Sequence, residues 1–227
     1  MSDPDTILEV IGFPQPPQAD PPYWLILLHG WGANAADLLP LVPLLAPDGQ
    51  GFTPNAPFPH PLVPGGRMWY ELNLQEDGTV RDPHGEPPRE PGPAAGDEAP
   101  IDYSCRLLEQ WLTTQDIDLS RTILGGFSQG GVMTLEVGLK YPFAGLVVFS
   151  GYWLRSLPRS EPSPPILMIH GNQDPVIPVQ AAQDSRDRLN QAGFKCTYRE
   201  LTMGHTINDQ AIALAYQFIK THKKVHK

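Results

Sequence analysis

Six short apolar segments punctuate the chain, each of strand length and each bounded by turn residues. They are residues 23–30, 51–57, 121–127, 145–151, 164–171 and 195–201. Within these segments apolar residues follow one another and do not alternate with polar ones. Continuous apolar runs are typical of strands that other elements cover on both faces. The pattern therefore predicts six strands inside a covered sheet.

Between the strand segments, apolar residues recur with the period of an α-helix. The spacing i, i+4, i+7, i+11 predicts one helix over residues 101–112. Three further helices are predicted at 132–142, 179–193 and 207–222, the first ended by a proline and the second by a glycine. Strands that alternate with helices indicate an α/β protein with a mainly parallel, doubly wound sheet and helices on both faces.

Proline interrupts this pattern at two places. Residues 35–47 have the leucine spacing of a helix, but Pro40 and Pro43 cannot both lie in a first turn, so a short or irregular helix is predicted. Residues 82–100 hold the densest prolines of the chain and are predicted to form a long surface excursion with polyproline character. Because the elements on both sides of that excursion fit one sheet, residues 1–227 are expected to form a single domain.

The charge and cysteine content narrow the classes of partner. The chain carries 16 Lys and Arg against 25 Asp and Glu, a net charge of −9, and its basic residues gather only in the tail at 220–227. A nucleic-acid partner is therefore not expected. Cys105 and Cys196 have no second cysteine nearby and are interpreted as core residues. No His or Cys spacing indicates a zinc or iron site, so no metal and no cofactor are expected.

The apolar segments are also too short to anchor the chain in a membrane. None approaches the ~20 apolar residues of a membrane span, and the first residues show neither a basic start nor an apolar run of signal length. We expect a cytoplasmic protein without integral membrane association. The sequence leaves open whether it forms an oligomer.

Residues 125–131 read GGFSQGG and join a predicted strand to a predicted helix. The spacing Gly126-x-Ser128-x-Gly130 matches the nucleophile elbow of α/β-hydrolases, a strand-to-helix turn so sharp that the serine takes a strained backbone conformation. A side chain at 126 or 130 would collide with the neighbouring strand or helix, so both flanks require glycine. Ser128 is predicted to stand exposed at the top of the sheet, although such a motif also occurs by chance.

A serine hydroxyl becomes a nucleophile when a histidine takes its proton and an acid holds that histidine. In α/β-hydrolases the three follow one another in the order serine, acid, histidine. His205 is the candidate base, because His170 precedes every well-placed acid and the other downstream histidines lie in the charged tail. Asp174 is the candidate acid, because Asp184 and Asp187 belong to a polar helix face.

Ser128, Asp174 and His205 each follow a predicted strand. The carboxyl ends of parallel strands share one edge of a sheet, so these residues are expected to converge there. Each acid or base also has a simpler interpretation, because Asp174 could hold a turn or cap a helix and His205 could lie on a surface loop. The agreement of chain order and strand-end position favours a catalytic triad.

Acyl transfer also requires hydrogen-bond donors for the oxygen that becomes negative. The elbow offers the backbone N–H of Gln129 at the start of a helix, and the glycine-containing loop in 27–34 offers that of Trp31. Because both donors are backbone groups, the identity of the Gln129 side chain is expected to matter little. Trp69 and Tyr70 are candidates for lining the substrate pocket, with burial in the core as the alternative.

Five segments together resemble one protein family. LLHGWGAN, RMWYEL, GGFSQGG, HGNQDPVIP and MGHTI occur in the order and spacing of the phospholipase/carboxylesterase family, which includes the acyl-protein thioesterases. The resemblance runs from about Tyr23 to Phe218. It implies a compact α/β-hydrolase without a large lid domain, hydrolysis of carboxylic esters or thioesters, and the same triad and oxyanion donors.

The chain departs from the usual pattern of that family in two places. Trp31 stands where a smaller aliphatic residue is common, and residues 82–100 replace a shorter connection. Both places are expected to lie where a substrate approaches. The acyl chain preference therefore does not carry over from the resemblance.

From these features we expect a serine hydrolase that cleaves carboxylic esters through an acyl-enzyme on Ser128. Thioesters and lysophospholipids are the alternative substrates, and the expected partner is a small ester or thioester. One competing hypothesis is a hydrolase-like protein that binds a small ligand without turnover, and another is a peptidase with the same triad. The triad argues against pure binding, because a receptor has no need of Asp174.

Overall fold

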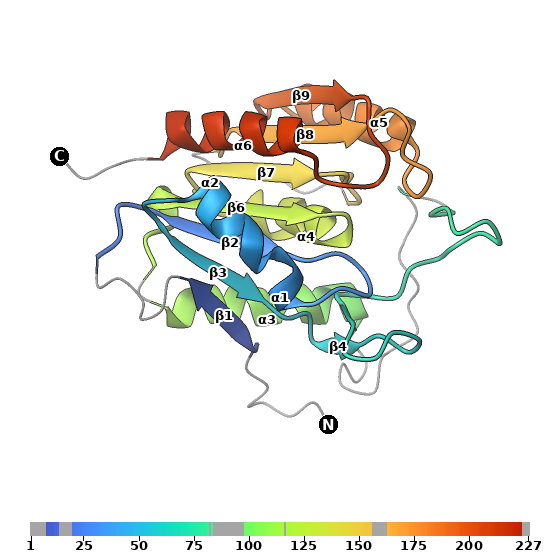
Figure 1. The fold of residues 1–227 in the computed structure, drawn as a ribbon, viewed down its shortest axis with the longest axis horizontal. Helices are drawn as coiled ribbons and strands as arrows, with labels where there is room; N and C mark the ends of the chain where they lie inside the picture. The colour runs from blue at the N-terminus through green and yellow to red at the C-terminus, as the bar shows by residue number, and fades with distance from the viewer. Residues whose placement is uncertain are drawn as a thin grey trace.

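The computed structural model describes residues 8–13, 20–81, 83, 98–115, 117–155 and 163–223. Its main sheet is built from β1 (Val10–Phe13), β2 (Trp24–Leu28), β3 (Gln50–Pro54), β6 (Thr122–Phe127), β7 (Gly145–Phe149), β8 (Ile166–Gly171) and β9 (Cys196–Leu201). The strand order is β1-β3-β2-β6-β7-β8-β9 (Figure 1). β1 pairs antiparallel with β3, and all other pairs in this sheet are parallel. The predicted mainly parallel α/β sheet is confirmed.

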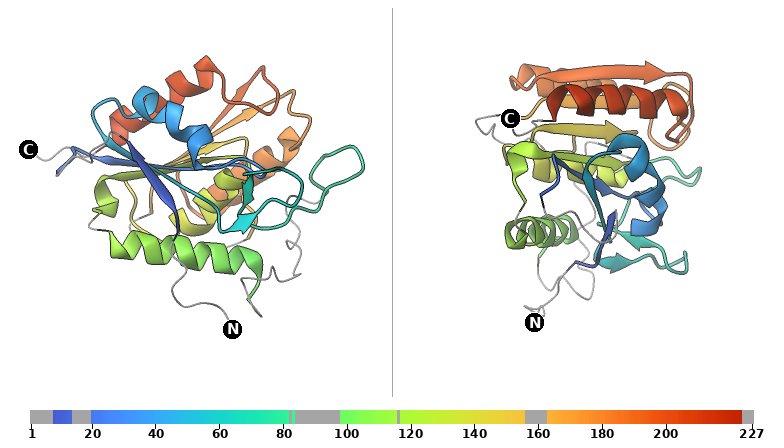
Figure 2. Two further views of the ribbon diagram at one scale, coloured as in Figure 1. Left: turned by 60° about the horizontal axis from the view of Figure 1, so that its bottom comes forward. Right: turned by 60° about the vertical axis from the view of Figure 1, so that its left-hand side comes forward.

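Helices cover both faces of this sheet (Figures 1 and 2). One face carries α1 (Ala35–Leu38), the 3₁₀-helix η1 (Leu39–Leu41), α2 (Val42–Leu45) and α6 (Asp209–His222). The other face carries α3 (Pro100–Thr114), α4 (Gln129–Gly138) and α5 (Val179–Gln191). The short 3₁₀-helix η2 (Leu119–Arg121) precedes β6. The doubly wound arrangement is thus the predicted one.

Each face of the sheet has its own buried core. Ile26 and Leu124 pack with the helices on one face, whereas Leu25 and Ile123 pack with those on the other. Successive residues of a strand point to opposite faces, so a strand between two helical layers needs apolar residues at every position. This is the physical reason for the continuous apolar runs in the sequence.

Glycine follows the end of α5 as predicted, whereas α4 ends at Gly138, four residues before the predicted stop at Pro142. The leucine-rich stretch breaks into three short pieces, with Pro40 in the first turn of η1 and Pro43 in the first turn of α2. Asn34 caps the first piece, since its side-chain oxygen accepts a hydrogen bond from the backbone N–H of Ala36 at 2.9 Å. Gly193 follows α5 with a φ of 86°, a conformation that glycine adopts without steric cost.

The edges of the sheet differ from prediction. β9 is not covered on both faces, because it is the last strand in the order and exposes Thr197, Arg199 and Glu200. Cys196 is therefore only partly buried, whereas Cys105 is buried as expected. The sequence reasoning missed β1, whose four residues are too few for a pattern. It also missed the two-stranded sheet of β4 (Phe58–Pro59) and β5 (Arg67–Met68).

Some predictions fall on parts of the chain that the structure does not describe. Residues 82 and 84–97 of the proline-rich excursion and residues 224–227 of the basic tail lie outside the described residues. In the described part, no helix has both the length and the apolar character needed to span a membrane. A single domain over residues 1–227 stays a prediction.

Candidate active site

Ser128 lies between β6 and α4 in the predicted strained turn. Its φ is 56° and its ψ is −119°, a backbone conformation that costs free energy for any residue with a side chain. A Cβ atom at Gly126 would collide with the carbonyl oxygen of Gly130, and one at Gly130 would collide with that of Leu28 in β2. The steric reason for both glycines is thus confirmed.

The predicted exposure of Ser128 is wrong. The residue is only 7% exposed, and its backbone N–H donates a hydrogen bond to the carbonyl oxygen of Phe149 at the end of β7. The loop after β2 also packs on it, because Gly30 lies close to the Ser128 Cβ atom. A strand end in the middle of a sheet is enclosed by the loops of its neighbours, so the hydroxyl faces other side chains.

The side chain that Ser128 faces is His205. The distance from His205 Nε2 to Ser128 Oγ is 2.9 Å, and the distance from His205 Nδ1 to Asp174 Oδ2 is 2.7 Å. Because an ionised carboxylate only accepts, Nδ1 donates to Asp174 and Nε2 can accept the serine hydroxyl proton. The structure brings the three residues into one hydrogen-bonded line, although their catalytic roles stay predictions.

Asp174 serves two groups at once. Its Oδ2 atom faces His205, while its Oδ1 atom accepts the backbone N–H groups of Val176 and Ile177, each at 2.9 Å. Burial alone would raise the pKa of Asp174, but the hydrogen bonds from His205, Ile177 and Val176 hold this pKa below its usual value. The turn-forming interpretation is therefore correct as well, and it is compatible with the role of acid.

Asp184, Asp187 and His170 are three of the candidates that the sequence rejected. Asp184 and Asp187 are exposed on α5, as expected. His170 in β8 lies instead behind Asp174, with its Nε2 atom 3.4 Å from Asp174 Oδ2 and 3.0 Å from the carbonyl oxygen of Ile177. Burial lowers the pKa of His170, which keeps the ring neutral. Sequence reasoning missed this neighbour, although its i, i+4 spacing to Asp174 was a signal.

The direction of the first predicted oxyanion donor, the N–H of Trp31, is set by the peptide group that joins Gly30 to Trp31. The Gly30 carbonyl oxygen accepts hydrogen bonds from His29 Nδ1 at 2.8 Å and from the backbone N–H of Ala33 at 3.2 Å. In a trans peptide the N–H points opposite to the C=O. Holding the Gly30 oxygen from one side therefore directs the Trp31 N–H to the other side.

The His29 ring that holds this peptide is neutral and has a defined tautomer. Its Nε2 atom accepts the backbone N–H of Ala56 at 3.0 Å, so the ring proton is on Nδ1. The residue is fully buried, and this burial lowers the pKa of His29 to about 4. His29 thus remains uncharged at neutral pH.

The second predicted donor, the N–H of Gln129, belongs to the first residue of α4. Such N–H groups have no acceptor inside the helix. Within the described part of the chain, neither this N–H nor that of Trp31 donates to a backbone carbonyl. Both groups are therefore available to a substrate oxygen.

The side chain of Gln129 makes buried hydrogen bonds that the sequence did not indicate. It is 2% exposed, its Oε1 atom accepts the backbone N–H of Trp69 at 2.9 Å, and its Nε2 atom donates to the carbonyl oxygen of Tyr70 at 2.6 Å. The expectation that its identity matters little for turnover stays a prediction, although these two hydrogen bonds were not expected. Trp69 and Tyr70 lie in the core, as the alternative interpretation expected, and are 0% and 2% exposed. Their part in a substrate pocket stays untested.

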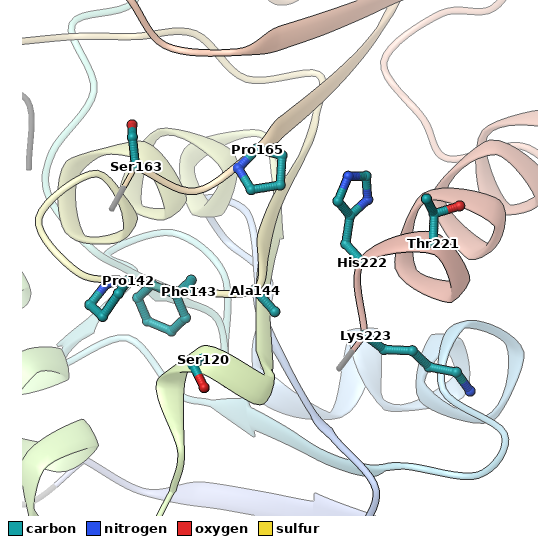
Figure 3. A pocket seen from close by; sticks show the side chains of 9 residues that line it. All are labelled: Ser120, Pro142, Phe143, Ala144, Ser163, Pro165, Thr221, His222 and Lys223. Carbon is teal, nitrogen blue, oxygen red and sulfur yellow. The ribbon is translucent and has the colours of Figure 1, made fainter. Parts of the chain in front are cut away.

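The cavity in Figure 3 lies elsewhere. It has a volume of about 370 Å³, and Ser120, Phe143, Pro165 and Lys223 are among its lining residues. These residues precede β6, β7 and β8 or follow α6, so the cavity is at the amino ends of the strands, opposite to Ser128. The Lys223 ammonium already pairs with Asp48 at 2.7 Å. No predicted site residue reaches this cavity.

No group of three or more His, Cys, Asp or Glu side chains is arranged to hold a metal ion within the described residues. Ser128, His205 and Asp174 form a hydrogen-bonded line at the carboxyl edge of the sheet. Such a line can transfer a proton from the hydroxyl to the imidazole and leave the oxygen nucleophilic.

Comparison with known proteins yields one family and several relatives. The family model described as Phospholipase/Carboxylesterase matches residues 13–223. Acyl-protein thioesterase 1 homolog 1 of Dictyostelium discoideum is 26% identical over 217 residues, which are 86% of this chain and 88% of that protein. Acyl-protein thioesterase 1 of Neurospora crassa is 39% identical over 101 residues, 40% of this chain and 41% of that protein. In four such relatives the chain covers only 41–56% of the relative's length.

A solved structure supports the same comparison. The crystal structure of esterase PE8 superposes with a TM-score of 0.75 at 26% sequence identity, covering 96% of this chain and 100% of that one. The Bacillus cereus carboxylesterase superposes with a TM-score of 0.74 over 96% of each chain, but at 16% identity, so it is evidence for the fold alone.

Proposed function

The chain belongs to the phospholipase/carboxylesterase family, and from this premise we propose that it is a serine hydrolase that cleaves carboxylic esters through an acyl-enzyme on Ser128. One observation carries the proposal. His205 bridges Ser128 and Asp174 with two short hydrogen bonds, in the tautomer that can accept the serine proton.

The first half of the proposed reaction forms the acyl-enzyme. Ser128 Oγ attacks the ester carbonyl carbon while its proton passes to His205 Nε2, and the ionised Asp174 stabilises the imidazolium. The carbonyl oxygen becomes negative and accepts the N–H groups of Trp31 and Gln129. When the bond to the alcohol oxygen breaks, that oxygen takes the proton from His205 and leaves.

The second half repeats these steps with water. A water molecule gives a proton to His205 Nε2 and attacks the acyl carbon, the same two N–H groups stabilise the negative oxygen, and the bond to Ser128 Oγ breaks. The proton returns to Ser128, and a carboxylic acid is released. Each half begins with a neutral His205, because only a neutral imidazole can accept a proton.

The names of related proteins support the substrate class. Related proteins are named carboxylesterases and acyl-protein thioesterases, and a thioester differs only in that sulfur leaves in place of oxygen. Lysophospholipids remain a further alternative. We propose ester hydrolysis as the shared chemistry. Nitrophenyl esters and acyl thioesters graded by chain length would show which substrate and which acyl length the protein prefers. A cytoplasmic location stays a prediction.

The decisive experiment removes the nucleophile. Ser128→Ala should reduce ester turnover by several orders of magnitude, as loss of the nucleophile does in triad enzymes, and should abolish labelling by a fluorophosphonate probe. Ser120→Ala, at the opposite end of the sheet, is the matched control and should behave like the unmodified protein. Turnover that survives in Ser128→Ala would contradict an acyl-enzyme on Ser128. Absence of turnover of every ester and thioester by the unmodified protein would favour the non-catalytic binding hypothesis.

A further inference from the structure

Trp69 connects the two elements that carry the predicted oxyanion donors. Its backbone N–H donates to Gln129 Oε1 at 2.9 Å, and its indole Nε1–H donates to the carbonyl oxygen of His29 at 2.9 Å. The first bond reaches the start of α4, next to the donor N–H of Gln129. The second reaches the loop after β2, two residues before the donor N–H of Trp31.

These bonds lie in the dry interior. His29 and Trp69 are both 0% exposed, and Gln129 is 2% exposed. Water cannot replace a buried hydrogen bond, so a displaced partner leaves an unpaired polar group, which is unfavourable. The two hydrogen bonds therefore hold Trp69, His29 and the Gln129 side chain in one arrangement.

The segment around Trp69 is itself held from further directions. The Gln129 Nε2 group donates to the carbonyl oxygen of Tyr70 at 2.6 Å. The oxygen and the nitrogen of the Gln129 side-chain amide therefore both bond to the backbone of residues 69–70. From α3, the Ser104 hydroxyl donates to the carbonyl oxygen of Trp69 at 2.5 Å. Trp69 is thus held in place, and both the start of α4 and the loop after β2 are hydrogen-bonded to it.

The sheet alone does not set the spacing of the two donors. β2 and β6 are paired in register up to Leu28 and Gly126, but Trp31 and Gln129 lie beyond the last paired residues. Their N–H groups must both point at one substrate oxygen, and a misplacement of about 1 Å can cost about 10²-fold in rate. Beyond the strand ends, Gly30 packs on Ser128, and Trp69 adds a hydrogen-bonded connection between the two elements.

We propose that Trp69 is a positioning residue that fixes the distance between the two oxyanion-hole amides through its backbone and indole N–H groups. The inference rests on the proposed function, because it assigns Trp69 a role in the same ester hydrolysis. Trp69 does not touch the reacting atoms. It acts through His29 and the Gln129 side chain.

The test is the substitution Trp69→Phe, which removes the indole N–H but keeps the backbone N–H and most of the apolar volume. Trp111→Phe is the matched control, since Trp111 lies in the same core and packs edge-on against Phe52 of β3. For Trp69→Phe we expect kcat to fall about 10- to 100-fold, because donors that are misplaced stabilise the oxyanion less. KM should stay within about twofold, since the amides act mainly in the transition state.

Two further measurements separate positioning from a general loss of structure. A trifluoromethyl ketone forms a hemiketal oxyanion with a nucleophilic serine, so its affinity should weaken by the same factor as kcat in Trp69→Phe. The pH dependence of kcat should keep its midpoint, because the line from Ser128 to Asp174 is untouched. Gln129→Met, which removes the other end of the tie, should show the same signature and decides the question if Trp69→Phe does not fold.

The inference is overturned if Trp69→Phe keeps full kcat, or if Trp111→Phe loses as much. It is also overturned if inhibitor affinity stays unchanged while kcat falls, or if the midpoint of the pH profile moves. These outcomes are distinct from failure of the proposed function, in which the unmodified protein would show no turnover that depends on Ser128.

Discussion

Replacing Asp174 with asparagine should separate its catalytic role from its structural one. The Asp174 Oδ1 atom accepts two backbone N–H groups, and an asparagine oxygen can keep both bonds. The Oδ2 atom, which accepts the His205 Nδ1–H at 2.7 Å, becomes an NH₂ group. Two donors cannot bond to each other, so His205 must move its proton to Nε2 and can no longer accept the proton of Ser128.

The expected magnitude follows from this loss of the working tautomer. In a triad, the same exchange lowers kcat by about 10⁴-fold, which corresponds to about 5.5 kcal/mol of activation free energy. The free energy of unfolding should fall by no more than about 2 kcal/mol, because one charge-assisted hydrogen bond is weakened and the turn is retained. Asp174→Ala should lose the same activity but also leave two N–H groups unpaired, at about 1–3 kcal/mol each.

The assay is hydrolysis of a nitrophenyl ester together with urea unfolding of the same preparations. Asp187→Asn, an exposed acid on α5 that also precedes His205 in the chain, is the control and should change neither quantity appreciably. An Asp174→Asn variant within tenfold of the original kcat would refute the role of acid. Equal stability of the asparagine and alanine variants would refute the role of Asp174 Oδ1 in the turn.

Two other predictions concern the framework of the site. Gly130→Ala should fail to reach the native fold, because the added Cβ atom would collide with the Leu28 carbonyl oxygen. Circular dichroism should show the loss of structure. The control Gly204→Ala should fold, because a Cβ atom there would make only ordinary van der Waals contacts. The pKa of His29 is lowered to about 4 by burial, so between that pH and about 6.5 the unfolded chain binds more protons than the folded one. The free energy of unfolding should therefore have its full value above about pH 6.5 and fall by about 3 kcal/mol as the pH drops to about 4. The pKa of His170 is also lowered by burial, so His170 adds to the loss in the same direction. Urea midpoints across this range should show the slope, and an equal slope in His29→Asn would contradict the assignment to His29.

Much of the fold was predictable because its signals are local. A strand between two helical layers must be apolar at successive positions, and a proline or glycine ends a helix through its own backbone, so six strands and four helices could be predicted from neighbouring residues. The elbow is local in part, since a Cβ atom at Gly126 would collide with Gly130 four residues later, whereas one at Gly130 would collide with Leu28 of β2. Strand ends then indicated which edge of the sheet would collect Ser128, Asp174 and His205.

What the sequence could not determine depends on contacts between distant segments. β9 proved to be an edge strand because of the order in which the strands pair, which a pattern of single strands does not contain. The burial of Ser128 depends on the loops that enclose it, and the placement of neutral His170 behind Asp174 depends on how the chain turns after β8. Gln129 and Trp69 are 60 residues apart, so their hydrogen bond exists only once β2, β6 and the loop before α3 are assembled. Periodic signals are carried by neighbours in the chain, whereas the directions of buried hydrogen bonds are decided only when tertiary packing excludes water and brings distant polar groups together.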